Sequence, residues 1–262
     1  MATGTILDDI VEDTYRRVAF ERTVRPFPEV MEGCAVRPRR TGYPFTRALE
    51  ADGMSFICEV KKASPSKGVI AQDFPYLDIA REYEEIGASA ISVLTEPHFF
   101  KGHNLYLEEI ADAVRTPVLR KDFIVDEYQI YQAKELGASA ILLIAAILKD
   151  KQLHDYRFLA ESLGMSVLVE THNREEVERA VSSGAEIIGV NNRDLKTFTV
   201  DLENSIRLRE HIPDGTITVS ESGIRTPEDV KRLKESGFDA VLVGETFMRS
   251  GDKKATIEAM RV

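Results

Sequence analysis

The segments Ile86–Leu94 (IGASAISVL) and Leu136–Ile144 (LGASAILLI) repeat one pattern at an interval of 50 residues. Weaker copies occupy residues 183–190 (SGAEIIGV) and 236–243 (SGFDAVLV). In each copy, an acidic amphipathic stretch ends at a glycine and a short apolar run follows. A glycine commonly ends a helix, and a continuous apolar run is typical of a strand buried on both faces. The repeat therefore predicts helices that alternate with buried parallel strands.

The same criteria predict further strands around these copies. Eight are expected, at residues 56–60, 90–94, 116–120, 140–145, 166–170, 187–190, 216–220 and 240–244. Eight strand–helix units in succession are typical of a closed (β/α)8 TIM barrel, a fold of the α/β class. An open doubly wound sheet is the alternative, but it usually has fewer strands and a glycine-rich first turn. Helix start signals agree, since Glu176 follows Asn173 by three residues and Pro227 directly follows Thr226.

The chain before the first strand is expected to be an extension of the barrel. Apolar residues between Ile6 and Val18 follow helical spacing, whereas Arg25–Gly42 is rich in proline and arginine and is expected to be irregular. We expect this N-terminal helical extension, residues 1–48, to pack on the barrel, residues 49–262, within the same domain. No low-complexity linker separates the two parts.

Composition and charge exclude several classes of function. Hydrophobic residues make up 43% of the 262, charged residues 30%, and the formal net charge is −10. An acidic surface repels phosphate backbones, so no nucleic-acid partner is expected. The longest nearly apolar run, residues 138–148, is about half the length that spans a bilayer, so no membrane partner is expected either. A small anionic substrate is compatible with this charge if a cleft supplies local positive charge.

Cysteines and histidines are too few and too scattered for a metal or disulfide framework. The two cysteines are Cys34 and Cys58, and the five histidines form no HxxxH or HxH pair. We therefore expect no metal site. The acidic N-terminus lacks the layout of a secretion signal, and a reducing cytoplasm is the expected location.

The active site of such a barrel lies at the carboxyl ends of its strands. In the first strand, side-chain alternation puts Glu59 and Lys61 on the face opposite Cys58, so the charged pair is expected in the barrel mouth. Alternation predicts the same inward direction for Lys121, Glu170 and Glu221. The sixth strand adds two more polar groups, Asn191 and Arg193.

Four charged residues on alternate strands, Lys61, Lys121, Glu170 and Glu221, are thus expected to converge at one height. Solvated strand ends or structural ion pairs are the alternative for any one of them. Buried lysines beside carboxylates shift each other's pKa values, which acid–base catalysis requires. His172 shares the inward face with Glu170, although a histidine hydrogen-bonded to a loop is the commoner case.

The loops after the last two strands are expected to bind a phosphate. The first carries Ser222 and Gly223 and the second carries Gly244, and glycines allow backbone N–H groups to approach an anion closely. The polar loop 61–68 (KKASPSKG) adds hydroxyls and cations, with a plain turn as its alternative. Two phenylalanines in the loop after the second strand, Phe99 and Phe100, fit either the core or an aromatic lid.

Six segments together resemble the indole-3-glycerol phosphate synthase family. They are EVKKASPSKG (59–68), LRKDF (119–123), LVET (168–171), GVNNRDL (189–195), SESGI (220–224) and VGETFM (243–248). They occur in that family's order and spacing, and the resemblance covers essentially the whole chain. It implies a cofactor-independent lyase of tryptophan biosynthesis. The reaction closes the indole ring of 1-(2-carboxyphenylamino)-1-deoxyribulose 5-phosphate with loss of CO₂ and water.

The resemblance also implies a role for each catalytic candidate. Lys121 would be the general acid at the ribulose carbonyl, and Glu170 the general base of the later proton transfers. Lys61 would assist near the substrate carboxylate, with Glu59 and Glu221 orienting lysines and hydroxyls. The division of the acid role between Lys61 and Lys121 stays open.

Substrate-binding groups are implied in the same way. Asn191, which also belongs to the catalytic set, and Arg193 would bind the anthranilate end and the hydroxyls. Phe99 and Phe123 would line the pocket for the aromatic ring. The residues implied at the phosphate end are Ser64, Ser222, Gly223, Gly244 and Glu245. The sequence departs from the family at His103, where a serine is expected. We expect a monomer, and contact with other tryptophan-pathway enzymes stays open.

Three other functions fit parts of the pattern. A Schiff-base aldolase also places a lysine at a barrel strand end near phosphate loops. Phosphoribosylanthranilate isomerase is a phosphate-binding barrel too, but that family uses a cysteine where this chain has Lys61, and Cys58 faces the other way. A non-catalytic phosphate-binding barrel would not require the paired Lys121 and Glu170.

Overall fold

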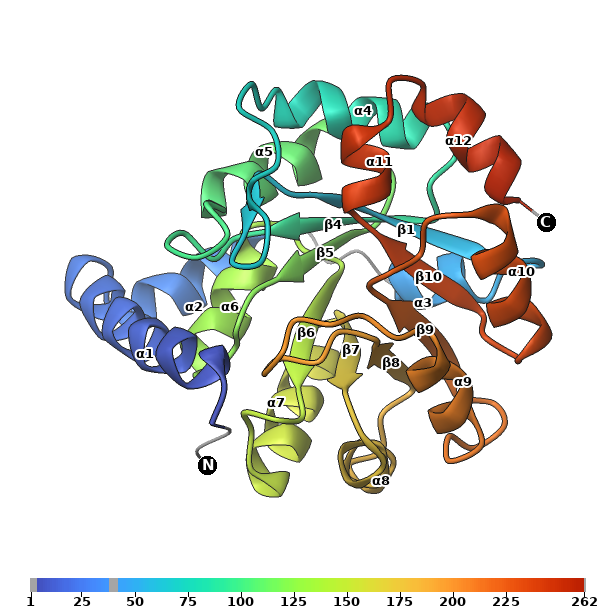
Figure 1. The fold of residues 1–262 in the computed structure, drawn as a ribbon. Helices are drawn as coiled ribbons and strands as arrows, with labels where there is room; N and C mark the ends of the chain where they lie inside the picture. The colour runs from blue at the N-terminus through green and yellow to red at the C-terminus, as the bar shows by residue number, and fades with distance from the viewer. Residues whose placement is uncertain (1–3, 38–41, 262) are drawn as a thin grey trace.

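The computed structural model describes residues 4–37 and 42–261, and its centre is a closed barrel of eight parallel strands (Figure 1). Around the barrel the strands are β1 (Ser55–Val60), β4 (Ala90–Leu94), β5 (Val118–Lys121), β6 (Ala140–Ile144), β7 (Ser166–Thr171), β8 (Ile187–Asn191), β9 (Ile217–Glu221) and β10 (Ala240–Val243). Strand β10 pairs with β1 and closes the ring. The (β/α)8 barrel predicted from the repeats is confirmed.

Helices cover the outside of the barrel (Figure 1). They are α4 (Tyr76–Glu85), α5 (Asn104–Ala113), α6 (Glu127–Glu135), α7 (Asp150–Ser162), α8 (Arg174–Ser182), α9 (Glu203–Arg209), α10 (Pro227–Glu235), α11 (Glu245–Arg249) and α12 (Lys253–Met260). Side-chain alternation divides the apolar residues into two cores. Phe56, Cys58 and Val60 of β1 pack in the helix layer, while Ile57 belongs to the barrel interior, as predicted.

The glycines of the repeat end helices by the predicted mechanism. Gly87, Gly137, Gly184 and Gly237 have φ angles of 77°, 89°, 80° and 83°, which a residue with a β-carbon rarely adopts. The third strand begins at Val118 rather than Thr116, because the Thr116 N–H donates to Glu84 and Pro117 has none to donate.

The described residues of the N-terminal extension form three helices, α1 (Ile6–Val24), α2 (Phe27–Val36) and α3 (Pro44–Leu49). The expectation that Arg25–Gly42 is irregular is therefore wrong for residues 27–36, and residues 38–41 lie outside the described part. Pro26 caps α2 and Pro28 lies in its first turn, where a missing N–H costs nothing. Val30 and Cys34 are buried on α2, which packs against α6.

Helices α1 and α3 both contact the interior of the barrel. Leu7 and Ile10 of α1 lie in the same apolar cluster as the inward residues of the strands, and so do Phe45 and Leu49 of α3. Ion pairs strengthen the attachment of α1: Arg17 meets Asp122 at 2.8 Å. None of the described helices is long and apolar enough to cross a membrane.

A short antiparallel pair, β2 (Ala63–Ser64) and β3 (Gly68–Val69), forms the loop that follows β1. The stretch expected to be a polar loop is thus a small hairpin over the carboxyl end of the barrel (Figure 1). Ala63 is buried and the β3 residues are exposed, which leaves the hydroxyl-bearing turn at 64–66 free to face the barrel mouth.

Candidate active site

A cavity of about 310 Å³ opens at the carboxyl ends of the strands. Its walls are strand ends, the loops that follow them, and Ile6, Leu7 and Ile10 of α1. All but one of the predicted site residues line it: Glu59, Lys61, Ser64, Lys121, Phe123, Glu170, Asn191, Arg193, Glu221, Ser222, Gly223, Gly244 and Glu245. The exception is Phe99. The contribution of α1 was not predicted, because helical spacing does not say which neighbour the apolar face covers.

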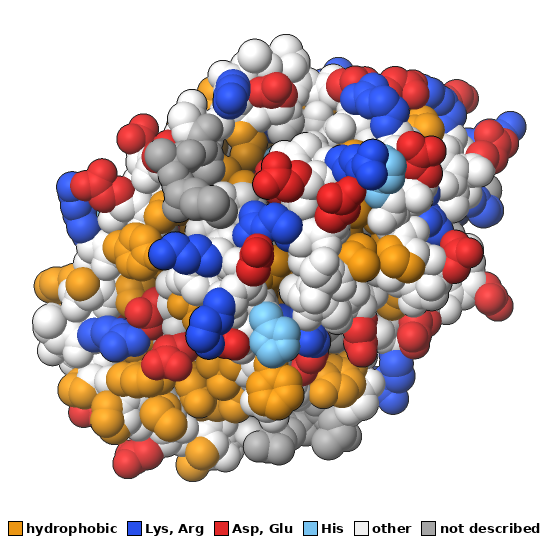
Figure 2. All heavy atoms as spheres, turned by 90° about the horizontal axis from the view of Figure 1, so that it is seen from below, with side chains coloured by type: hydrophobic (Ala, Val, Ile, Leu, Met, Phe, Trp, Pro, Cys, Tyr) orange, Lys and Arg blue, Asp and Glu red, His pale blue; other side chains and the backbone are white. Residues whose placement is uncertain are grey.

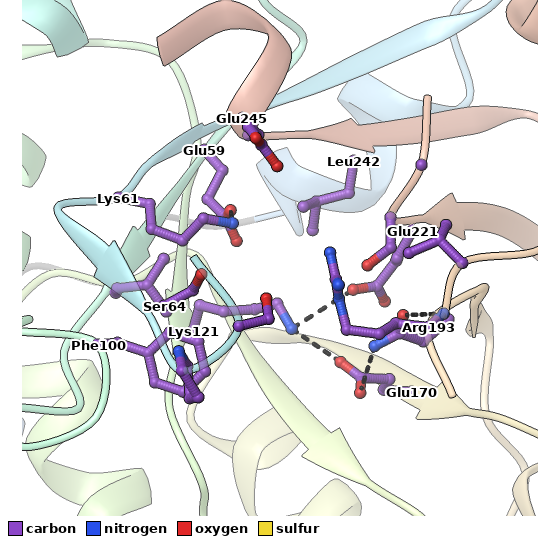
Figure 3. A pocket seen from close by; sticks show the side chains of 18 of the residues that line it. Glu59, Lys61, Ser64, Phe100, Lys121, Glu170, Arg193, Glu221, Leu242 and Glu245 are labelled. Carbon is purple, nitrogen blue, oxygen red and sulfur yellow. Dashed lines mark hydrogen bonds and ion pairs between the residues drawn. The ribbon is translucent and has the colours of Figure 1, made fainter. Parts of the chain in front are cut away.

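Lys121 lies at the centre of a buried charge cluster (Figure 3). Its Nζ donates to Glu170 Oε2 at 2.7 Å and lies 3.4 Å from Glu221 Oε2. The Asn191 side-chain amide donates to Glu170 Oε1 at 3.1 Å. The side chains of Lys121, Glu170 and Glu221 are only 15%, 5% and 2% exposed, so water screens these charges weakly.

Lys61 forms a separate ion pair with Glu59 on the opposite side of the cavity (Figure 3). Of the four charged residues predicted to converge, Lys121, Glu170 and Glu221 therefore form one cluster, whereas Lys61 pairs with Glu59 instead. Gly244 lies against that pair, and a β-carbon there would overlap the Glu59 carboxylate. Gly189 likewise leaves room for the Glu221 side chain, because a β-carbon at position 189 would overlap Glu221 Oε1.

The cluster holds its three ionisable groups in different states. Burial opposes a charge on Lys121, but Glu170 and Glu221 outweigh it and raise the lysine pKa above its ordinary value. Burial opposes ionisation of Glu170 too, and Lys121 with His172 outweighs it, so its pKa is lowered. For Glu221, burial dominates and raises the pKa to about 7. A lysine of raised pKa, a carboxylate of lowered pKa and a carboxyl of raised pKa thus share one wall, as acid–base chemistry requires.

The end of the cavity near β9 and β10 has a backbone shaped for close approach. Ser222 and Gly223 follow β9 with φ angles of 68° and 87°. Gly244 caps the short helix α11, whose first residue is Glu245. Arg225 also lines the cavity and was not predicted, although it directly follows the SESGI motif. Backbone N–H groups with nearby guanidinium groups suit a phosphate.

The loop after β4 is organised by one buried carboxylate, Glu96. Its oxygens accept the backbone N–H groups of His98, Phe99 and Phe100 at 2.9, 2.7 and 2.9 Å. This arrangement aims Phe100 at the cavity, where its ring lies 5.8 Å from that of Phe123. Phe100, rather than Phe99, therefore forms the aromatic wall together with Phe123.

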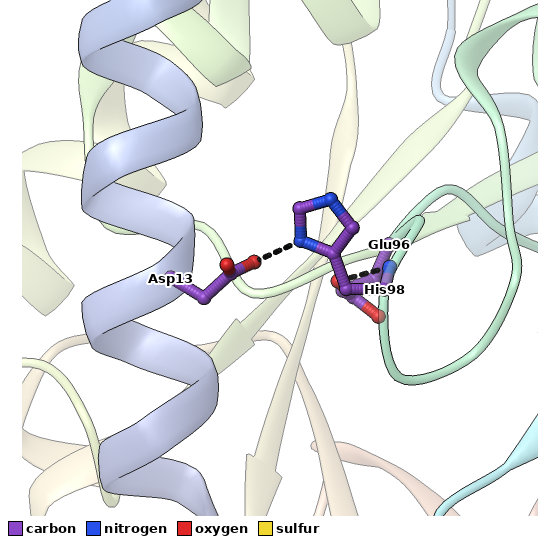
Figure 4. Close-up of side chains that lie close together, drawn as sticks. All are labelled: Asp13, Glu96 and His98. Atoms are coloured by element: carbon purple, nitrogen blue, oxygen red, sulfur yellow. Dashed lines mark hydrogen bonds and ion pairs between the residues drawn. The ribbon is translucent and has the colours of Figure 1, made fainter.

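The same loop is linked to α1 through His98, whose Nδ1 lies 2.6 Å from an Asp13 oxygen (Figure 4). Ligand atoms of Asp13, Glu96 and His98 lie within 4.8 Å of one another, a spacing compatible with a metal. However, both Glu96 oxygens already accept backbone hydrogen bonds. The group is therefore explained as a connection between α1 and the loop.

His103, the departure from the family pattern, has a structural role of its own. It is the N-cap of α5, and its Nδ1 accepts the Leu105 N–H at 3.0 Å. Serine is among the preferred N-cap residues because its side-chain oxygen accepts this same bond. The histidine thus supplies the cap that the expected serine would provide.

Beneath the catalytic wall lies a buried network that was not predicted. Arg120 is fully buried and donates to Asp122 at 3.0 Å and to Thr95 at 3.2 Å. Asp122 also meets Arg17 of α1. Side-chain alternation could have indicated this network. Because Lys121 faces the cavity, its neighbour Arg120 must face the helix layer, where a buried charge needs hydrogen-bonding partners.

Comparison with known proteins gives a consistent result. The family model described as Indole-3-glycerol phosphate synthase matches residues 7–260. Enzymes of that name from Lacticaseibacillus casei and Ruminiclostridium cellulolyticum are 53% and 49% identical over 256 residues, covering 98% of each chain.

Solved structures of other enzymes share the barrel. A 3-hexulose-6-phosphate synthase superposes with a TM-score of 0.64 at 15% identity, covering 79% of this chain and 98% of that one. A thiamine phosphate pyrophosphorylase from Pyrococcus furiosus gives 0.59 at 17% identity, covering 79% and 93%. At such low identity these likenesses show the fold alone.

Proposed function

The chain belongs to the indole-3-glycerol phosphate synthase family, and from this premise we propose how its barrel mouth carries out the reaction. The enzyme is a carboxy-lyase of tryptophan biosynthesis that closes the indole ring of 1-(2-carboxyphenylamino)-1-deoxyribulose 5-phosphate. The observation that carries the proposal is the buried Lys121–Glu170 pair at 2.7 Å. It joins a proton donor and a proton acceptor inside a cavity that is also lined by other cations.

The substrate phosphate binds at the end of the cavity formed by the loops after β9 and β10. Backbone N–H groups of Gly223, Gly244 and Glu245 and the hydroxyls of Ser64 and Ser222 are the donors available there. The anthranilate ring packs at the other end, against Phe100, Phe123 and the apolar side chains of α1. In this orientation the phosphate faces polar groups of the cavity and the aromatic ring faces apolar side chains.

Lys121 acts first, as the general acid. It protonates the ribulose carbonyl oxygen while the ring carbon bearing the carboxylate attacks the carbonyl carbon. The ring-closed iminium then accepts the electron pair released when CO₂ leaves. The substrate thus contains its own electron sink, and the residues need only move protons and fix geometry.

Dehydration follows and requires an acid and a base together. Glu170, held ionised, removes a ring proton, and the hydroxyl takes a proton from the Lys61 ammonium and departs as water. Lys61 lies with Glu59 on the facing wall, near the departing carboxylate, and assists proton delivery there. Asn191 and Arg193 hold the hydroxyls and the anthranilate end, and Glu221 orients the Lys121 ammonium.

The proposal extends to the setting of the enzyme. We place it in the cytoplasm as a monomer, because the chain belongs to a family of biosynthetic enzymes and one chain supplies all the described cavity walls. Contacts with other tryptophan-pathway enzymes would have to use its outer surface.

Mixing the purified enzyme with its substrate tests the reaction. Indole fluorescence should grow in step with CO₂ release, against little background because the chain has no tryptophan. Borohydride added during turnover should trap no adduct. A lysine adduct without indole would instead support an aldolase that acts through a Schiff base.

A further inference from the structure

Glu170 has a second neighbour that the proposed steps do not use. One carboxylate oxygen, Oε2, meets Lys121. The other, Oε1, accepts from Asn191 and lies 3.2 Å from Nε2 of His172. His172 follows β7 directly and is 13% exposed, so it contacts the base from the side away from Lys121.

His172 is itself held from the helix that follows. Glu176 of α8 places Oε2 3.0 Å from His172 Nδ1, and the same oxygen accepts the His172 backbone N–H at 2.8 Å. Asn173 donates to the other Glu176 oxygen at 2.7 Å, and Asn204 of α9 donates to the His172 carbonyl at 3.1 Å. Hydrogen bonds therefore hold the His172 ring, the His172 backbone and the Glu176 carboxylate in place.

This arrangement differs from an ordinary capping box. In that motif the acidic residue accepts from the N-cap N–H, which here belongs to Asn173. Glu176 instead accepts from His172, one residue earlier, as well as from its ring. The carboxylate is therefore committed to His172, and the imidazole lies between two carboxylates, Glu170 and Glu176.

We propose that His172 is a positioning residue, which fixes Oε1 of Glu170 as an imidazolium held by Glu176 and so leaves Oε2 directed at Lys121 and the substrate. The inference rests on the proposed role of Glu170 as the base. His172 need not touch the substrate, since it acts through the carboxylate it holds. A cation at this place also favours the ionised form of Glu170.

The charges around His172 support a permanent cation. Glu170 from β7 and Glu176 from α8 face it, and Lys121 pairs with the other oxygen of Glu170. Burial alone would lower the pKa of His172, but its bonds with the two carboxylates raise it to about 10. At neutral pH the ring therefore carries its proton: Nδ1 is hydrogen-bonded to Glu176, and Nε2 forms an ion pair with Glu170 at 3.2 Å.

His172→Gln is the decisive variant, because it removes the cation but keeps a hydrogen-bonding side chain. Without the cation the pKa of Glu170 rises, so the acid limb of the kcat profile should move up by about one pH unit. We expect kcat to fall about tenfold at neutral pH, with KM changing less than about twofold. His154→Gln, at an exposed histidine on α7, should leave both constants and the profile unchanged.

A second variant and a second readout keep the test independent of folding and of activity. Glu176→Gln should shift the kcat profile in the same direction but less. In histidine-labelled enzyme, NMR should show one of the five imidazoles protonated up to about pH 9, absent from the His172→Gln spectrum. The pKa of this imidazole should be lower in Glu176→Gln than in the parent enzyme.

The outcomes separate this inference from the proposed mechanism. A His172→Gln enzyme with the parent's kcat and pH profile, or an imidazole that titrates near its ordinary pKa, would overturn the positioning role. Full activity in Glu170→Gln would instead remove the base assignment. The NMR titration would still show whether His172 is protonated at neutral pH between Glu170 and Glu176.

Discussion

Glu221 is a buried carboxyl whose proposed role in catalysis comes at a cost to stability. It is 2% exposed, and its Oε1 has no hydrogen-bond partner among the described residues. Its neighbour Glu170 is already ionised beside Lys121, so a second negative charge is unfavourable there. A protonated Glu221 can instead offer its hydroxyl to a substrate oxygen.

This state predicts how stability depends on pH. A carboxyl whose pKa rises to about 7 on folding stabilises the fold at low pH, and this contribution is lost as pH rises from about 4.5 through 7. Glu221→Gln cannot ionise, so its stability relative to the parent should rise by roughly 1–3 kcal/mol between pH 5 and pH 8. Urea denaturation at both pH values measures the difference.

A matched control is Glu228→Gln at an exposed position of α10, which should leave the slope of stability against pH unchanged. Equal slopes for the parent and Glu221→Gln would show that Glu221 ionises in the folded enzyme as easily as in the unfolded chain. That result would show that folding does not favour the protonated form of Glu221.

Several site residues were predictable one at a time, but their pairing was not. Alternation along each strand put Glu59, Lys61, Lys121, Glu170 and Glu221 in the mouth. Which lysine meets which carboxylate depends on strand register and side-chain rotamers, and neither is encoded within a single strand. Phe100 shows the same limit, because only the Glu96 turn decides which of two adjacent rings faces the cavity.

At the scale of elements, α1 is as much a part of the cavity as the strands are. Its apolar side chains line the wall, and Arg17 reaches the buried Asp122 next to Lys121. The side chains of Arg17 and Asp122 are 8% and 0% exposed. An ion pair in such a place matters most when one partner is removed, because the other is left buried and less well paired.

Arg17→Gln should therefore lower the free energy of unfolding by about 2–4 kcal/mol and raise KM, because α1 would be held less firmly over the cavity. Arg16→Gln is the matched control. Arg16 pairs with Glu12 on the solvent side of the same helix, both largely exposed, so its loss should cost under about 0.5 kcal/mol. Chemical denaturation and steady-state kinetics would measure both. Equal effects of the two changes would contradict a special role for the buried pair.

Helix α2 shows where sequence patterns fail for an element. Two prolines and flanking arginines predict an irregular chain here, yet both prolines stand where a helix begins. The buried face of α2 has only Val30 and Cys34, too few for a clear helical period. Its partner surface on α6 makes the helix favourable, and that surface is distant in sequence.

At the scale of the whole molecule, closure of the barrel assembles the site. Strand register aligns Asn191 with Glu221 and Glu170 with Gly189, so side chains from separate strands meet at one height. The internal repeat predicted the number of strands, and hence the barrel. It could not predict this register, because register depends on all eight strands closing together.

The surface explains how a protein of net charge −10 can bind an anion. Acidic and basic side chains are interspersed over the face in Figure 2, so no large region of one sign dominates there. The cations that we propose for substrate binding, Lys61, Lys121 and Arg193, line the cavity, where they lie among carboxylates that include Glu59 and Glu170. These cations are the local positive charge that the proposed binding of a phosphate and a carboxylate requires.

The central claim is that Lys121 donates the proton that starts ring closure. Lys121→Met keeps the length of the side chain and removes the ammonium, so indole formation should fall by about 10³-fold or more. Calorimetry should show that a phosphate ligand still binds, since the phosphate end is separate from Lys121. Lys151→Met, at a lysine that is 86% exposed, is the control and should retain full activity. A folded Lys121→Met enzyme with kcat within tenfold of the parent would contradict the account.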